Sequence, residues 1–183
     1  MRILGIAGSL RSGSHNRALI RAARELAPSG VEVVEFDLRG LPFYDGDVEA
    51  AGDPEAVAAF KDAIRSAGAL LISTPEYNHG IPGVLKNAVD WASRPALASP
   101  LVGKPVAIMG ASTGRGGTRR AQWQLREALT FPRAAVLEPH VLVPEAYMRF
   151  DEHGELADEE TRAKIAGLLD SLAAVADGVT LAA

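Results

Sequence analysis

Short apolar runs alternate with amphipathic stretches along the chain, and this alternation constrains the fold more than any other feature of the sequence. The apolar runs predict buried strands over residues 3–7, 31–36, 69–73 and 105–109, and a fifth over 134–143 that contains Pro139. Apolar residues spaced by three and four predict helices over residues 16–27, 82–92, 117–129 and 158–177. A further helix begins at Asp53-Pro54 with Asp53 as its N-cap, after a Gly- and Pro-containing loop over 38–52.

Five strand–helix repeats favour the α/β class, with a parallel sheet covered by helices on both faces. Five strands fit the flavodoxin-like order 2-1-3-4-5, a three-layer sandwich, better than the six-stranded dinucleotide-binding order. A length of 183 residues suits one domain rather than two. We therefore expect residues 1–183 to form a single domain with one doubly wound sheet.

Composition and charge exclude several classes of protein. The sequence has no cysteine, which excludes disulfides and thiolate catalysis, and its four histidines lack metal-ligand spacing, so we expect no metal site. A net charge of −4 argues against nucleic-acid binding. The apolar run at 3–7 is too short for a signal peptide, and no run reaches the roughly 18 residues of a membrane span. We expect a cytoplasmic protein without membrane contact.

Three loops of unusual composition follow predicted strands, over residues 8–15, 74–80 and 110–117. Ligands of a doubly wound sheet bind beyond the carboxyl ends of its strands, so these loops are the first candidates for a site. The first loop reads Gly8-Ser9-Leu10-Arg11-Ser12-Gly13-Ser14-His15-Asn16. Hydroxyls, Arg11 and a following helix start predict an anion site, whereas the missing P-loop lysine argues against a nucleotide triphosphatase. The alternative is a plain turn with Asn16 as an ordinary N-cap.

The second and third loops offer groups suited to a flat ligand. Tyr77 is placed to lie against a ring, and the backbone N–H groups of Glu76–Asn78 are placed to face ring heteroatoms. The alternative makes Tyr77 and Trp91 core aromatics, and we favour it for Trp91 alone because a large aromatic residue at a helix end usually packs. In the third loop, four glycines allow close approach of a ligand and Ser112 is a donor, although a flexible surface turn is equally consistent.

Two of these segments resemble a known family. They are the loop from Gly8 to Asn16 and, about 60 residues later, Pro75-Glu76-Tyr77-Asn78…Pro82-Gly83-x-Leu85-Lys86-Asn87-Ala88-x-Asp90-Trp91. Together they resemble the NADPH-dependent FMN reductase family, and most of all its bacterial quinone and chromate reductases. The resemblance extends from about Arg2 to Val143. It implies a flavodoxin-like fold, bound FMN, NADPH or NADH as co-substrate, and assembly into a homodimer or homotetramer.

The resemblance also implies roles for individual residues. By position, Ser9, Arg11, Ser14 and Asn16 would hold the FMN phosphate, with Leu10 and His15 in the same loop. The isoalloxazine ring would be lined by Pro75, Glu76, Tyr77, Asn78 and His79, with Ser112 at its far edge. His79 stands where close relatives often have tyrosine, and His15 where they often have an aromatic residue.

The implied activity is the transfer of a hydride from the nicotinamide through flavin N5 to an acceptor such as a quinone, a flavin, chromate or an azo compound. One flavin face would serve both substrates in turn, which gives ping-pong kinetics. We expect no catalytic side chain, because the flavin carries the chemistry. Two alternatives stay open: an electron-transfer flavodoxin that never meets NAD(P)H, since a fold does not fix a function, and a reductase that uses free FMN as a substrate.

Overall fold

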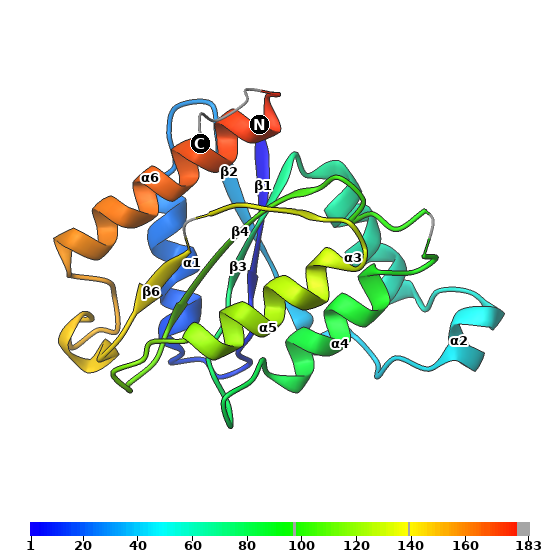
Figure 1. The fold of residues 1–183 in the computed structure, drawn as a ribbon, viewed down its shortest axis with the longest axis horizontal. Helices are drawn as coiled ribbons and strands as arrows, with labels where there is room; N and C mark the ends of the chain where they lie inside the picture. Colours follow the sequence, from blue (N-terminus) through cyan, green and yellow to red (C-terminus); the bar gives the residue numbers. More distant parts are fainter. Residues whose placement is uncertain (97, 139, 179–183) are drawn as a thin grey trace.

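The computed structural model describes residues 1–96, 98–138 and 140–178, in which strands and helices alternate (Figure 1). The strands are β1 (Arg2–Ala7), β2 (Glu32–Phe36), β3 (Ala69–Ser73), β4 (Pro105–Ala111), β5 (Ala135–Val136) and β6 (Val141–Val143). The α-helices are α1 (His15–Glu25), α2 (Gly46–Ala51), α3 (Glu55–Ser66), α4 (Gly83–Ala92), α5 (Arg119–Thr130) and α6 (Glu159–Ala176). Two short 3-10 helices are η1 (Leu38–Gly40) and η2 (Ala146–Met148).

All the strand pairs are parallel, and the order β2-β1-β3-β4-β5 confirms the predicted flavodoxin-like arrangement. The predicted fifth strand over 134–143 is instead two short strands on the same side of β4. β5 pairs with Pro105 and Val106 at the start of β4, and β6 pairs with its last three residues, 109–111. The pairing with β6 extends β4 to Ala111, two residues beyond the predicted end. The prediction that Pro139 lies in a strand falls outside the described residues.

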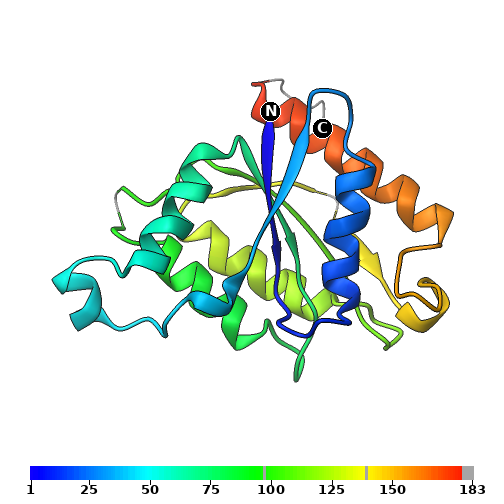
Figure 2. The same cartoon turned by 180° about the vertical axis from the view of Figure 1, so that it is seen from behind.

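The sheet separates two hydrophobic cores, and helices cover it on both faces (Figures 1 and 2). Helices α1 and α6 cover one face, where Ile3 and Leu71 of the sheet pack with Leu19 of α1. Helices α3, α4 and α5 cover the other face, where Leu4 packs with Phe60. Neighbouring strand residues such as Ile3 and Leu4 belong to opposite cores because side chains alternate along a strand. Burial on both faces explains why these strands read as continuous apolar runs.

The helix that begins near Asp53 differs from the prediction at its start. Pro54 occupies the N-cap position, and no side chain in the described part of the chain caps this end. The Asp53 carboxylate instead accepts hydrogen bonds from Nζ of Lys61 at 2.7 and 2.8 Å. The Lys61 side chain is only 1% exposed, and a buried ammonium requires a counter-charge. Asp53, which we predicted to cap this helix, therefore neutralises the buried ammonium group of Lys61 instead.

The loop predicted over 38–52 contains η1 and the six-residue helix α2, which stands out from the body of the protein (Figure 1). Tyr44 attaches this segment to α4, because its backbone N–H donates to Asn87 Oδ1 at 2.8 Å. Its hydroxyl donates to Glu49 within α2 at 2.7 Å. No residue of α2 is buried, so apolar periodicity could not have revealed the helix.

Candidate functional site

The three loops singled out from sequence meet at the carboxyl edge of the sheet, the lower edge in Figure 1. Backbone hydrogen bonds join them to the strand ends. The N–H of Gly8 donates to Ser73 O at 2.8 Å, and the N–H of Thr74 donates to Met109 O at 2.9 Å. A Cβ on Gly8 would lie 3.2 Å from Pro75 Cδ and 3.0 Å from Leu85 Cδ2, so the first loop touches the second. Glycine at this position permits the close contact.

A cavity of about 300 Å³ lies between the loops. It is lined by Ser9, Arg11, Ser14, His15, Asn16, Pro75, Glu76, Tyr77, Ala111, Ser112 and Thr113. Nine of these residues were predicted from sequence, and only Ala111 and Thr113 were not. The structure therefore brings together side chains that lie up to about 100 residues apart in the chain.

The first loop presents backbone donors at the start of α1. Ser14, not Asn16, is the N-cap: its Oγ accepts a hydrogen bond from the Asn16 N–H at 3.2 Å, so Asn16 as an ordinary cap is wrong. Within the described ranges, the backbone N–H groups of Ser12, Gly13 and His15 donate to no protein acceptor. Adjacent free N–H groups beside an arginine, here Arg11, favour an anion.

Asn16 is buried and its side chain joins three elements. Its Nδ2 donates to Ala111 O at 2.9 Å, and its Oδ1 accepts from the Ala111 N–H at 2.9 Å. The same Oδ1 accepts from Ser73 Oγ at 3.0 Å. These bonds fix the start of α1 against the ends of β3 and β4, and they satisfy polar groups that would otherwise be buried without partners.

The second loop ends in a tight two-residue turn. Two backbone hydrogen bonds between Tyr77 and Gly80, both 3.0 Å long, close it. Asn78 and His79 form the turn with φ angles of 52° and 63°, the left-handed region that two-residue hairpin turns require. The Tyr77 hydroxyl lies 3.4 Å from Ser9 Oγ and its side chain is half exposed, so Tyr77 is not a core residue. Trp91 is fully buried, as predicted.

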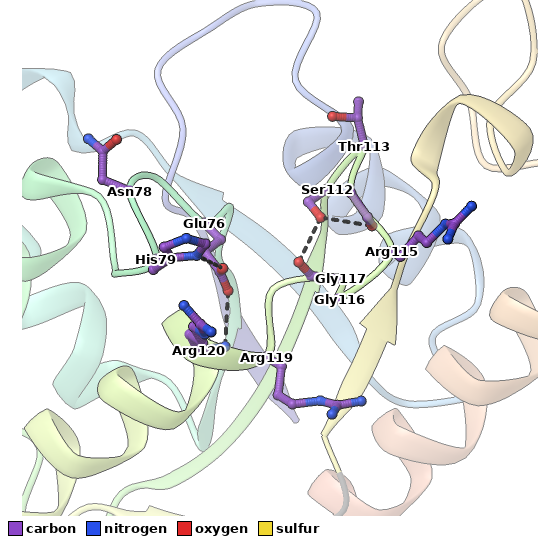
Figure 3. Close-up of a pocket in the computed structure, with 11 residues that line it drawn as sticks. Glu76, Asn78, His79, Ser112, Thr113, Arg115, Gly116, Gly117, Arg119 and Arg120 are labelled. Atoms are coloured by element: carbon purple, nitrogen blue, oxygen red, sulfur yellow. Dashed lines mark hydrogen bonds and ion pairs between the residues drawn. The ribbon is translucent and has the colours of Figure 1, made fainter.

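Glu76 fastens the second loop to α5 (Figure 3). Its Oε2 accepts hydrogen bonds from the backbone N–H groups of Arg120 at 2.9 Å and Ala121 at 3.2 Å. Its Oε1 lies 3.3 Å from His79 Nδ1. The carboxylate thus occupies the positive end of the helix and supports the His79 ring at the same time.

The side-chain hydroxyl of Ser112 holds the third loop in its conformation. Ser112 Oγ donates to Gly117 O at 2.6 Å, and its backbone N–H donates to Val143 O at 3.1 Å. Gly110, predicted to begin this loop, is a residue of β4. A Cβ there would lie 2.2 Å from both Thr74 O and Thr118 Oγ1. Gly110 is therefore required for the packing of β4 against the second loop and the start of α5 rather than for approach of a ligand.

A second cavity, of about 860 Å³, adjoins the first and shares Glu76, Ser112 and Thr113 with it (Figure 3). Its other lining residues are Asn78, His79, Gly114, Arg115, Gly116, Gly117, Arg119 and Arg120. Asn78 and His79, two of the predicted site residues, thus face this larger space. Leu10 lines neither cavity; its backbone O accepts a hydrogen bond from Arg39. The three arginines were not predicted, although their clustering after a strand end was visible in the sequence.

His15 is positioned by an aromatic contact. Its ring centroid lies 4.5 Å from that of Phe150, with the planes tilted by 37°. Burial lowers the pKa of His15, and the nearby positive charge of Arg11 lowers it further. His15 is therefore neutral at neutral pH, and Arg11 is left as the cationic side chain of the first loop.

Two further observations concern the described residues alone. None of their helices combines the length and apolar composition needed to cross a membrane. They also contain no group of three or more His, Cys, Asp or Glu side chains placed to hold a metal ion.

A parallel sheet in the order 2-1-3-4-5, with an anion-accepting loop beside a cavity at its carboxyl edge, defines a flavodoxin-like mononucleotide-binding protein. The sequence model of the NADPH-dependent FMN reductase family matches residues 1–147. The chain belongs to this family, as its two sequence motifs predicted.

Individual relatives agree with this assignment. The chain is 49% identical over 173 residues to an NAD(P)H-dependent FMN reductase of Pseudomonas aeruginosa, covering 94% of this chain and 93% of the relative. It is 41% identical to a 2-hydroxy-1,4-benzoquinone reductase of a Burkholderia species, with 95% of each chain covered. Among solved structures, FerB, a flavoenzyme NAD(P)H:(acceptor) oxidoreductase from Paracoccus denitrificans, matches with a TM-score of 0.87 and 32% identity, over 98% of this chain and 99% of FerB.

Proposed function

We propose that this chain is an FMN-containing, NAD(P)H-dependent oxidoreductase that reduces small-molecule acceptors, with quinones as the principal class. Membership of the FMN reductase family supports the cofactor and the reaction type. The quinone class is supported by the relative named as a benzoquinone reductase, whose length the chain covers almost completely. Free flavin, chromate and azo compounds are further acceptors that an accessible two-electron donor would reduce.

The observation that carries the proposal is the set of free donors in the first loop. The N–H groups of Ser12, Gly13 and His15 and the guanidinium of Arg11 match the needs of the FMN phosphate. Ser9 and Ser14 line the same cavity with hydroxyl groups. Asn16 lines it too, and its bonds to Ala111 and Ser73 make it the residue that positions the loop.

The second and third loops would hold the isoalloxazine ring. Pro75, Glu76, Tyr77 and Ser112 line the cavity next to the first loop, and Asn78 and His79 continue into the larger cavity. When bound, FMN supplies the two-electron chemistry between nicotinamide and acceptor. The protein residues bind and orient it, and we assign no side chain as a catalytic acid or base.

The proposal also covers the domain organisation, the compartment and the assembly of the protein. Residues 1–183 act as one FMN-binding domain in the cytoplasm, where NAD(P)H is available, and the chain assembles into a homodimer or homotetramer. Exposed apolar side chains support assembly, because Phe43 is 85% exposed and Phe131 is 82% exposed.

Anaerobic reduction tests the function directly. Purified yellow protein is mixed with NADPH or NADH while the visible absorbance of the flavin is followed, and a panel of acceptors is then added. We expect bleaching without a partner reductase, followed by reoxidation by quinones. Flavin that stays oxidised with both nicotinamides would instead support the electron-transfer alternative. Loss of all colour on gel filtration would support FMN as a free substrate.

The order of substrates is tested by steady-state kinetics. Because the two cavities at these loops adjoin and share Glu76, Ser112 and Thr113, nicotinamide and acceptor should occupy the same side of the flavin in turn. Double-reciprocal plots at several fixed acceptor concentrations should therefore give parallel lines, and excess acceptor should inhibit competitively against NAD(P)H. Intersecting lines, or a stable complex of protein, nicotinamide and quinone, would show that the two substrates have separate pockets.

A further inference from the structure

Three arginine side chains without carboxylate partners line the larger cavity (Figure 3). Arg115, Arg119 and Arg120 are exposed, and none of them forms an ion pair within residues 1–96, 98–138 and 140–178. Elsewhere arginines are commonly paired, as in Arg21–Glu155 at 2.8 Å and Arg149–Asp158 at 2.6 Å. Three arginines without an ion-pair partner thus line one cavity in a chain whose net charge is −4.

Among the described residues, Glu76 is the carboxylate that lines this cavity, and it is already engaged. Glu76 accepts hydrogen bonds from two backbone N–H groups of α5 and lies beside His79. Its charge is therefore directed toward the helix end rather than toward the guanidinium groups. Lining arginines without a carboxylate partner make the potential in the cavity positive, and this potential attracts an anionic ligand. The arrangement points to an anion as the natural occupant.

Arg115 and Arg119 also border a smaller cavity of about 220 Å³ next to α6. The other two cations there, Arg149 and Lys164, are paired with Asp158 and Glu160. The available positive charge is therefore that of the arginine cluster, Arg115, Arg119 and Arg120, which adjoins the proposed flavin cavity.

Size and position identify the class of anion. A volume of about 860 Å³ lies within the range of small-molecule sites, roughly 300–1,000 Å³. The cavity shares Glu76, Ser112 and Thr113 with the proposed flavin cavity, so an occupant of the larger cavity would lie beside the flavin. A neutral quinone has no charge for three arginines to neutralise. A nicotinamide dinucleotide has a flat reactive ring at one end and phosphate groups along its length.

We propose that the arginine cluster binds the phosphate groups of the nicotinamide dinucleotide and selects NADPH over NADH through the 2′-phosphate. The proposal rests on the proposed function and assigns one of its substrates to named residues. The guanidinium group is suited to the task because its planar fork of donors matches phosphate oxygens. The 2′-phosphate adds a charge of about −1.5 to −2 at neutral pH, and NADH lacks that group.

Binding and reduction experiments on FMN-loaded protein test the assignment. Arg115→Ala, Arg119→Ala and Arg120→Ala are made singly and together. Calorimetry measures the affinity for adenosine 2′,5′-bisphosphate and for 5′-AMP, and anaerobic stopped-flow mixing measures flavin reduction by NADPH and NADH. The control is Arg24→Ala, which removes another exposed arginine, from the last turn of α1 at the opposite edge of the sheet.

We expect the wild type to prefer NADPH and to bind the bisphosphate more tightly than 5′-AMP. In the triple variant, the ratio of flavin reduction by NADPH to that by NADH should fall by at least about tenfold. Its affinity for the bisphosphate should fall by a similar factor. Arg24→Ala should change neither quantity by more than about twofold, because it lies outside the cavity. Retained FMN content in each variant shows that the flavin site is intact.

Several outcomes would overturn the assignment. They are a wild-type preference for NADH, a triple variant whose preference stays within twofold of wild type, and a loss confined to FMN content or to the acceptor's KM. Failure of the proposed function is distinguishable from these outcomes. In that case neither nicotinamide reduces the wild-type flavin, whereas bisphosphate binding still reports on the arginine cluster.

Discussion

The side-chain amide of Asn16 pairs with the backbone of Ala111 through two hydrogen bonds of 2.9 Å, one in each direction. The two residues lie 95 positions apart in the chain. This pair joins the start of α1 to the last residue of β4, and so joins the proposed phosphate loop to the third loop. Ser73 adds a bond from the end of β3 to the same amide oxygen.

Replacing this amide should destabilise the whole carboxyl edge of the sheet. Asn16→Ala leaves the buried N–H and C=O of Ala111 without partners, which should cost about 2–5 kcal/mol of the free energy of unfolding. Urea denaturation of the apoprotein measures this loss. Ser14→Ala is the matched control, because it removes only the helix cap and should cost about 1 kcal/mol. Equal losses in the two variants would contradict a special role for Asn16.

Removing the cation of the first loop should weaken FMN binding. Arg11→Ala deletes a charge-assisted contact of about 1.5–3 kcal/mol, so the FMN dissociation constant should rise by about tenfold or more. Titration of apoprotein with FMN, followed by flavin fluorescence, gives the constant. Arg24→Ala serves again as the control of equal charge. A constant within twofold of wild type would show that Arg11 does not contact the phosphate.

His79 should affect the acceptor more than the cofactor. Its ring stands at the exposed tip of the second loop and lines the larger cavity, where it can stack on a flat substrate. His79→Ala should raise the acceptor's KM while FMN affinity changes little, and His79→Tyr should restore a stacking ring. If loss of FMN is the main effect, His79 belongs to the cofactor's surroundings instead.

The stability of the fold should decrease in acid because Asp158, the N-cap residue of α6, becomes protonated there. Hydrogen bonds from Thr161, and then from Arg149, lower the pKa of Asp158 to about 2. The folded-state pKa lies below the unfolded value of about 3.9, so the carboxylate stabilises the fold above about pH 4 and this contribution is lost toward pH 2. Asp158→Asn should therefore lower the Tm at pH 7 by more than at pH 3. A uniform decrease across thermal melts would contradict this origin.

Light scattering tests the proposed assembly. Phe43, Trp123 and Phe131 expose large apolar surfaces, and closed two-fold assemblies are the commonest way to cover such surfaces. The mass at micromolar concentration should be two or four times that of one chain. The mass of a single chain would rule the assembly out.

The sequence predicted those strands and helices whose apolar residues form a local, repeated pattern. Strands β1, β3 and β4 are apolar runs buried on both faces, and α6 has a long apolar stripe, so each was found nearly at its true bounds. The fifth strand was predicted as one element because two- and three-residue strands such as β5 and β6 carry no periodic pattern. Asp53 was misassigned because its partner Lys61 lies eight residues away, beyond the first turn that capping patterns describe.

Most of the candidate site was predictable for a different reason. Once the strands are known, the topology places the loops that follow them at one edge, so residues such as Ser9 and Tyr77 could be grouped in advance. The structural role of Asn16 could not be seen, because its partner Ala111 is distant in sequence. The arginine cluster was missed because whether a cation has a partner depends on the folded surroundings of its side chain.

The contact of Gly8 with Pro75 and Leu85 has a thermodynamic consequence for ligand binding. It fixes the spacing between the loop proposed for the phosphate and the loop proposed for the ring before any ligand arrives. Two proline rings, those of Pro75 and Pro82, further restrict the second loop. Little conformational entropy then remains to be lost on binding, so the affinity of the site reflects its contacts more than the ordering of its loops.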